Sequence, residues 1–239
     1  MRLLPFDAAN QFIDLYFPNC RIAFLAGSAS RGEHKPNSDL DIVVIDESRP
    51  TAYRESFFEF GWRIEAFIHN KDSYRTYFES DIRRGRPTLP NMIFSGLVLK
   101  DDGTAQTLKQ EALQLLQDGP EPLTLKDISA SRYFLTDLLD DFIDADHTDE
   151  ALIILNTLSI QVAEFILRSN GKWIGRGKGL VKELRQYEEL LCDRFIDRLQ
   201  SYYQNDNKEP FIRFVDEMLE PHGGRLFEGF SMGKQINRL

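Results

Sequence analysis

The stretch "GSASRGEHKPNSDLD", residues 27–41, separates two short apolar runs and decides how the first half of the chain is interpreted. "RIAFLA" (21–26) precedes it and "DIVVID" (41–46) follows it. Both runs are rich in residues that favour β-strands. The stretch itself is too polar to be core. The pattern therefore predicts two strands joined by a polar connection, with aspartates where the second strand begins.

Asp39 and Asp41 are the first candidate functional residues. Alternate residues of a strand point to the same face, so we expect these two side by side with Leu40 turned away. Two adjacent carboxylates repel each other unless a cation neutralises them, and hard oxygen ligands suit Mg²⁺. The expected strand "WRIEAFIH" (62–69) carries a third carboxylate, Glu65. If this strand pairs beside the one that holds Asp41, the three carboxylates form a metal-binding cluster.

Gly27 and Ser28 follow the first strand and are expected to open a short helix. Backbone N–H groups at such a turn attract anions, glycine lets the backbone approach a phosphate, and the serine hydroxyl adds a donor. A phosphate cradle beside paired aspartates fits phosphoryl or nucleotidyl transfer with a bridging Mg²⁺. Plain helix capping is the alternative for Ser28. Arg31 either reaches the triphosphate or pairs with a local acid.

The composition and net charge of the whole chain limit the classes of partner that we expect. It has 239 residues, 42% of them hydrophobic, and a formal net charge of −9. No basic stripe dominates, so we expect no nucleic-acid partner. Cys20 and Cys192 are expected to be reduced thiols of a cytoplasmic protein. No apolar run approaches the roughly 20 residues that span a bilayer, so we expect no membrane partner. The sequence indicates no oligomeric state.

The pattern of elements changes near residue 120. Before it, short strand-like runs, including 93–100, alternate with helices; after Gly119, Pro120 and Pro122 the pattern is helical. The expected later helices cover 131–146, 151–169, 179–203 and 209–220. We therefore predict an α+β protein. A mixed-sheet domain with flanking helices occupies residues 1–120, and a helical-bundle domain that binds the acceptor occupies residues 121–239.

The motif resembles that of a known superfamily. Gly-Ser, ten residues, Asp-x-Asp and a carboxylate on a later strand resemble the signature of the DNA polymerase β-like nucleotidyltransferases. "AGSASRGEHKPNSDLDIVVI" (26–45) is especially similar to bacterial aminoglycoside and lincosamide nucleotidyltransferases, whose α/β domain precedes a helical domain. The resemblance implies that Asp39 and Asp41 bind two Mg²⁺ ions and that Glu65 binds the ion nearer the attacking oxygen. It also implies that Gly27 and Ser28 hold the β- and γ-phosphates.

Two residues of the second domain are further candidates. Thr157, Gln161, Glu164 and Arg168 form a polar stripe that faces either solvent or a cleft between the domains. Kanamycin-type enzymes resembling this chain carry a catalytic glutamate on a helix of the second domain, which implies Glu164 here. Lys178, in a glycine-rich turn, either neutralises triphosphate charge or is simply part of a basic loop between helices.

These observations together predict an enzyme, a magnesium-dependent nucleotidyltransferase. It would move a nucleoside monophosphate, with ATP as the expected donor, to a hydroxyl of a small molecule and release pyrophosphate. An aminoglycoside-like compound is one acceptor class. The general base is Glu65 or Glu164. Two alternatives stay open, namely transfer of adenylate to a partner protein and a non-catalytic module that only binds nucleotide.

Overall fold

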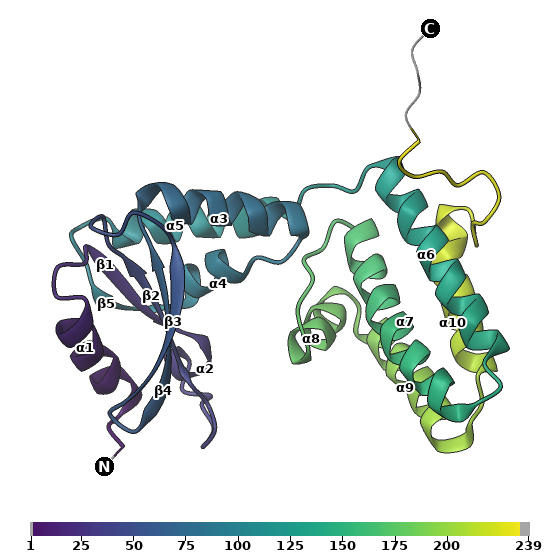
Figure 1. The fold of residues 1–239 in the computed structure, drawn as a ribbon, viewed down its shortest axis with the longest axis horizontal. Coiled ribbons are helices and arrows are strands. Elements are labelled where there is room, and N and C mark those ends of the chain that lie inside the picture. The colour runs from purple at the N-terminus through teal and green to yellow at the C-terminus, as the bar shows by residue number, and fades with distance from the viewer. Residues whose placement is uncertain (1, 235–239) are drawn as a thin grey trace, which may run out of the picture. The chain divides into compact units, whose positions relative to one another are not determined.

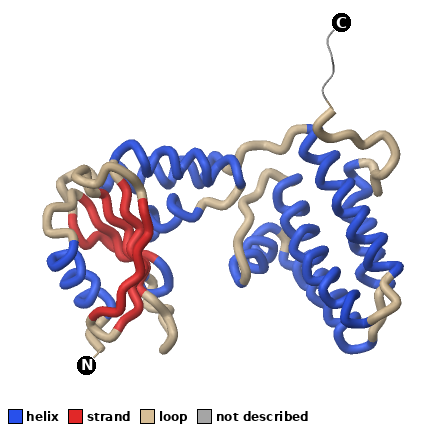
Figure 2. The backbone as a smooth tube through the Cα atoms, viewed as in Figure 1, coloured by secondary structure: helices blue, strands red, loops and turns tan. Residues whose placement is uncertain are grey.

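The structure, a computed structural model, describes residues 2–234 of the chain. The chain divides into two compact units, Met1–Pro120 and Glu121–Leu239. Within the described residues all strands belong to the first unit, and the second unit consists of helices and connections (Figure 1, Figure 2). The α+β class expected from the sequence is confirmed.

The first unit is built on one five-stranded sheet. Its strands run in the order β3-β4-β2-β1-β5. They are β1 (Ile22–Ala26), β2 (Leu40–Ile45), β3 (Tyr53–Glu59), β4 (Trp62–His69) and β5 (Leu97–Lys100). The neighbours β2 and β4 are parallel, while the other neighbouring pairs are antiparallel. The sheet is therefore mixed, as predicted.

Two strands differ from the sequence-based expectation. β3 was not expected, because it is an edge strand whose residues are mostly exposed and form no apolar run. It joins β4 through the two-residue turn Phe60-Gly61, where both φ angles are positive, as in a tight hairpin turn. The expected strand 93–100 is shorter, because Ile93 is fully buried in the last turns of a helix and only Leu97–Lys100 pair with β1.

Helices cover both faces of this sheet. α1 (Pro5–Tyr16) packs on the face that presents Leu25, Ile42 and Ile64. The other face presents Phe24 and Val43 to three helices. These are α3 (Lys71–Arg84), α4 (Thr88–Ser95) and α5 (Ala105–Asp118). Side chains alternate along a strand, so Asp41, two positions before Val43 in β2, also faces this second side. Glu65, two positions before Phe67 in β4, faces the same side.

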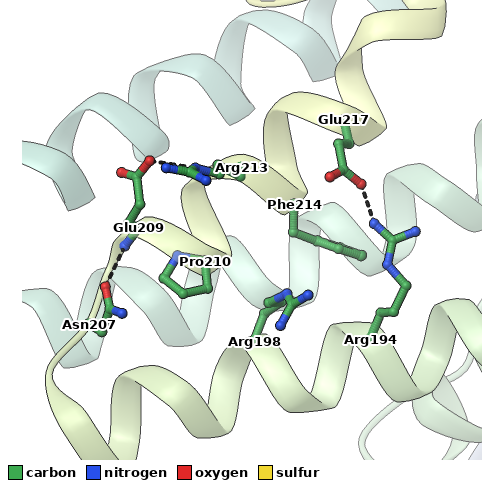
Figure 3. A pocket seen from close by; sticks show the side chains of 8 residues that line it. All are labelled: Arg194, Arg198, Asn207, Glu209, Pro210, Arg213, Phe214 and Glu217. Atoms are coloured by element: carbon green, nitrogen blue, oxygen red, sulfur yellow. Dashed lines mark hydrogen bonds and ion pairs between the residues drawn. The ribbon is translucent and has the colours of Figure 1, made fainter.

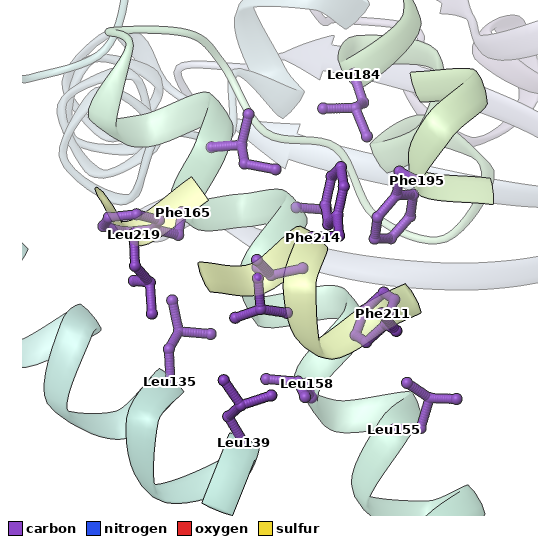
Figure 4. Close-up of a cluster of buried hydrophobic side chains, with 14 of the residues drawn as sticks. Leu135, Leu139, Leu155, Leu158, Phe165, Leu184, Phe195, Phe211, Phe214 and Leu219 are labelled. Atoms are coloured by element: carbon purple, nitrogen blue, oxygen red, sulfur yellow. The ribbon is translucent and has the colours of Figure 1, made fainter. Parts of the chain in front are cut away.

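The second unit has its own hydrophobic core. It contains α6 (Leu125–Asp144), α7 (Thr148–Ser169), α8 (Lys178–Tyr187), α9 (Glu189–Asn205) and α10 (Glu209–Leu219), followed by a 3₁₀ turn, Glu220–His222. Leu139, Leu158 and Phe211 meet in this core (Figure 4). The expected helix 179–203 is two helices, because the backbone is extended at Glu188.

The helix α7 lies against this core along one side. By length and composition alone it could cross a membrane, with an 18-residue window of mean hydropathy 1.6. That differs from the expectation that no apolar run approaches such a length. Leu155, Leu158 and Val162 are fully buried within the unit, while Ile153 and Ile160 are exposed. The apolar composition of α7 is thus largely explained by its place in a protein core.

We predict that Leu158→Ala lowers the free energy of unfolding by about 2–5 kcal/mol, because it leaves a cavity where no solvent reaches. Ile153→Ala is the matched control on the same helix. Ile153 is 69% exposed, so its truncation should change the unfolding free energy by no more than about 0.5 kcal/mol. Urea unfolding followed by circular dichroism measures both. Equal losses would contradict the core assignment of α7.

Candidate active site

Three carboxylates converge where β2 begins and its pairing with β4 starts. Asp41 lies in β2, Glu65 is its register partner in β4, and Asp39 precedes β2 by one residue. One carboxylate oxygen from each of the three lies within 4.8 Å of the others, and all three residues are half-buried. The structure therefore brings together the three acids that the sequence singled out. Their role as metal ligands remains a prediction.

The chemistry of this cluster fits a divalent cation. All three donors are carboxylate oxygens, which are the ligands that Mg²⁺ prefers. Among the described residues 2–234, the side-chain carboxylates of Asp39 and Asp41 have no hydrogen-bond or ion-pair partner. Their oxygens are thus available to a ligand, and together with Glu65 they would hold the cation.

The environment of Asp41 disfavours its charge. Burial, the largest cause, and the negative charges of Asp39 and Glu65 together raise the pKa of the Asp41 carboxyl from 3.8 to about 6. The positive charges of Arg54 and Arg31 act in the opposite direction on this pKa. The carboxylate pair is therefore electrostatically costly unless a cation is added.

Gly27 leaves room for the Asp41 carboxylate. It follows β1 directly, begins the short helix α2 (Gly27–Ser30) and has a φ of +69°. A Cβ atom at this position would lie 2.1 Å from Asp41 Oδ2. A side chain here would therefore displace the carboxylate as well as strain the backbone. This steric requirement is a second reason for glycine, beside the phosphate approach expected from the sequence.

Ser28 is tied to the connection that carries Asp39. Its hydroxyl lies 3.3 Å from Ser38 Oγ, which also accepts a hydrogen bond from the Lys35 N–H at 2.8 Å. The Ser28 carbonyl accepts a hydrogen bond from the Glu33 N–H. No side-chain cap is present on α2, whose N-cap residue is Ala26. The capping alternative for Ser28 is therefore not observed, and its phosphate contact remains a prediction.

Arg31 pairs with a local acid, one of its two expected arrangements. Its Nε lies 2.9 Å from Glu33 Oε2, and both side chains are largely exposed. The charge of Arg31 still acts on Asp41 from this position. A contact of Arg31 with a triphosphate remains a prediction.

Arg54 is a residue of this cluster that the sequence interpretation missed. It lies in β3 and forms an ion pair with Glu65. It was missed because β3 itself was not expected. The available signal was the alternation in "YRESFFE", where Tyr53 and Phe57 are separated from each other by polar residues.

The remaining predicted site residues lie in the second unit. Glu164 is a half-buried residue of α7, and Lys178 is the exposed first residue of α8. The predicted polar stripe needs a correction at Arg168, which is buried and donates from Nη2 to the carbonyl of Glu121 at 2.6 Å. Arg168 therefore faces neither solvent nor an open cleft. The roles of Glu164 and Lys178 remain predictions.

A cavity of about 480 Å³ lies between α9 and α10 in the same unit (Figure 3). It is lined by Arg194, Arg198, Asn207, Glu209, Pro210, Arg213, Phe214 and Glu217. Arg213 pairs with Glu209 at 2.6 Å, and Arg194 pairs with Glu217. Arg198 has no partner among the described residues. The three arginines outnumber the two glutamates, so this cavity suits an anionic ligand better than a cationic one.

Comparisons with known proteins agree with the geometry. Residues 22–94 match the model of a nucleotidyltransferase domain family, and this range contains all three carboxylates. A nucleotidyltransferase-like protein from Exiguobacterium sibiricum has a similar solved structure, with a TM-score of 0.51 and 11% sequence identity. The likeness covers 90% of this chain and 74% of that one, and at this identity it concerns the fold. No curated protein matches the chain significantly.

We predict that Gly27→Ala weakens the binding of Mn²⁺ at least tenfold, because the added methyl group displaces Asp41 from the cluster. Gly32→Ala is the matched control. Gly32 has a φ of +70° but nothing within 4 Å of a Cβ atom, so it carries the same backbone strain of about 1 kcal/mol without the collision. Isothermal titration with Mn²⁺ compares the two. Equal affinities would show that position 27 requires glycine only because of its positive φ angle.

We also predict a pH-dependent stability difference between Asp41→Asn and the wild type in metal-free buffer. A carboxyl whose pKa is higher in the folded state stabilises the fold below its ordinary pKa and loses that contribution as the pH rises. Relative to the variant, the wild type should therefore lose unfolding free energy between about pH 4 and pH 6 and then level off. The loss is at most about 3 kcal/mol. Urea unfolding at a series of pH values measures it; a difference that does not change with pH would contradict the prediction.

Proposed function

We propose that the protein is a nucleotidyltransferase that transfers a nucleoside monophosphate from ATP to a hydroxyl group, because residues 22–94 match the model of a nucleotidyltransferase domain family. The reaction depends on Mg²⁺ and releases pyrophosphate. The observation that carries the proposal is the cluster of Asp39, Asp41 and Glu65, whose oxygens lie within 4.8 Å of one another.

The cluster has a defined task in this proposal. The three carboxylates would hold Mg²⁺, as two ions when the nucleotide is present, and the metal would supply a lower pKa for the attacking hydroxyl and positive charge beside the triphosphate. Asp39 and Asp41 would hold the cations from the β2 side, and Glu65 would contribute its carboxylate from β4. Because both strands belong to one sheet, the carboxylates keep their spacing while the acceptor enters.

The phosphates are assigned to the turn after β1. Gly27 presents bare backbone beside Asp41, which supports a close approach of the β- and γ-phosphates to the cluster. Ser28 offers its hydroxyl from the next position, and Arg31 is an exposed cation at the end of the same short helix. Lys178 is proposed to add a positive charge from the second unit.

The proton of the acceptor hydroxyl needs a base. Glu65 is one candidate, because it already lies in the cluster; Glu164 of α7 is the other. A base must come within hydrogen-bond reach of the proton in the complex with substrate. We therefore propose that Glu65 serves unless the acceptor is bound beside Glu164.

The acceptor is proposed to be a small molecule bound by the second unit. The net charge of −9 favours a cationic compound of aminoglycoside type, as the sequence motif also suggests. The cavity between α9 and α10 does not support such a compound, because its arginines would repel it. A cationic acceptor would therefore have to bind elsewhere on the unit. A partner protein is the second candidate acceptor, and both fit a cytoplasmic enzyme without nucleic-acid or membrane partners.

The decisive experiment incubates the full chain with Mg²⁺, each of the four nucleoside triphosphates and panels of acceptors. Pyrophosphate release reports transfer, and mass spectrometry identifies the molecule that has gained a nucleotide. A mass gain on a small hydroxyl compound supports the proposal, while a gain on a protein favours the second candidate. Nucleotide binding without any release would indicate a non-catalytic module.

We predict that Asp41→Asn and Asp39→Asn each reduce the rate of nucleotidyl transfer by about 10³-fold or more, because each removes a charge that holds the metal. Glu55→Gln is the matched control. Glu55 is an exposed acid of β3 and is the register partner of Ala66, so its side chain lies on the opposite face from Glu65. Pyrophosphate release measures all three rates. Near-wild-type activity of either aspartate variant would exclude the proposed site.

A further inference from the structure

The ion pair between Arg54 and Glu65 occupies one of the three proposed metal ligands. Arg54 comes from the edge strand β3, where its side chain is 55% exposed, and reaches across to β4. Its register partner is Phe67, two residues after Glu65 and therefore on the same face of the sheet. The guanidinium carbon lies 4.9 Å from the centroid of the Phe67 ring. Two contacts, one ionic and one with a ring face, thus place the guanidinium beside the cluster.

The position of the Arg54 guanidinium matters because the neighbouring cluster is strongly negative. Three carboxylates carry a formal charge of −3, and the cations that act on Asp41 are Arg54 and Arg31. Arg31 is paired with Glu33. Among the described residues, Arg54 is therefore the cation that is paired directly with a member of the cluster.

A metal ion and a guanidinium cannot use the same oxygen lone pair. Arg54 donates to Glu65 Oε2, and a cation bound between the three acids also requires a Glu65 oxygen. A divalent ion beside an unmoved Arg54 would in addition face a like charge at close range. Both cations draw on the negative charge of the Glu65 carboxylate and repel each other, so binding of the ion weakens the pairing of Arg54 with Glu65. The side chain of Arg54 is 55% exposed and has room to move into solvent.

We propose that Arg54 is a built-in counter-cation of the metal-free site that competes with the divalent ion for Glu65. It offsets part of the repulsion among the carboxylates before the ion arrives, and this contribution is lost when the ion binds. Arg54 is thus a positioning residue that sets the metal affinity. The inference rests on the proposed function, because it takes Asp39, Asp41 and Glu65 as the metal ligands.

The test compares Arg54→Met with a matched variant, Arg63→Met. Arg63 lies on β4 two residues before Glu65 and is exposed, and its side chain has no hydrogen-bond or ion-pair partner among the described residues. Both variants remove one positive charge near the cluster, but only Arg54→Met removes the competitor. Titration calorimetry with Mn²⁺ at constant ionic strength gives the dissociation constants. We expect Arg54→Met to bind Mn²⁺ about fivefold more tightly than the wild type, and Arg63→Met less than twofold more tightly.

Thermal unfolding with and without Mn²⁺ provides a second readout. Arg54→Met should unfold at a lower temperature than the wild type without metal and recover most of the difference when Mn²⁺ is saturating. A merely structural role would lower the unfolding temperature equally in both conditions, and this result would overturn the inference.

The outcomes separate the inference from the proposed function. If the wild type binds Mn²⁺, Asp41→Asn abolishes binding, and Arg54→Met binds no more tightly than Arg63→Met, the counter-cation role is overturned while the metal site stands. If the folded wild type does not bind Mn²⁺, the metal site and the inference both fail. Tighter binding by Arg54→Met alone, with the metal-dependent recovery of stability, supports both.

Discussion

The parallel pairing of β2 with β4 is the constraint on which the candidate site depends. It sets Asp41 beside Glu65 in register, near the start of β2. A neighbouring pair of half-buried acids is unfavourable in itself, as the raised pKa of Asp41 shows. The apolar residues that follow in both strands are buried between two layers of helices. Their packing fixes the register and thereby holds the acids together.

The chain around the cluster accommodates these acids in several ways. Gly27 has no side chain at the one place where a Cβ atom would touch the Asp41 carboxylate. Ser38, immediately before Asp39, accepts a hydrogen bond from Lys35 and contacts Ser28, so the connection between β1 and β2 is tied at both ends. Arg54 supplies a positive charge from the sheet edge. The site is thus supported by the backbone geometry of the β1–β2 connection and by the positive charge of Arg54.

The second unit is held together independently of this sheet. Its core is formed by helices of that unit alone, with α7 contributing a row of fully buried residues. The buried Arg168 donates to the carbonyl of Glu121, the first residue of the unit, and so anchors the segment that leads into α6. The arginine-rich cavity between α9 and α10 adds a surface whose charge is opposite in sign to the net charge of the chain.

The sequence by itself determined what depends on local geometry. The i, i+2 spacing of Asp39 and Asp41, the glycine after β1 and the periodicity of the later helices follow from single elements, and the α+β class follows from their succession. Tertiary structure alone decided what depends on distant partners. β3 has no apolar run and exists because β4 offers it a pairing edge, so Arg54 could not be placed beside Glu65 beforehand. The sequence likewise did not determine the pairing of Arg31 with Glu33 or the burial of Arg168. The partner of a charged side chain depends on which groups the folded chain brings within reach.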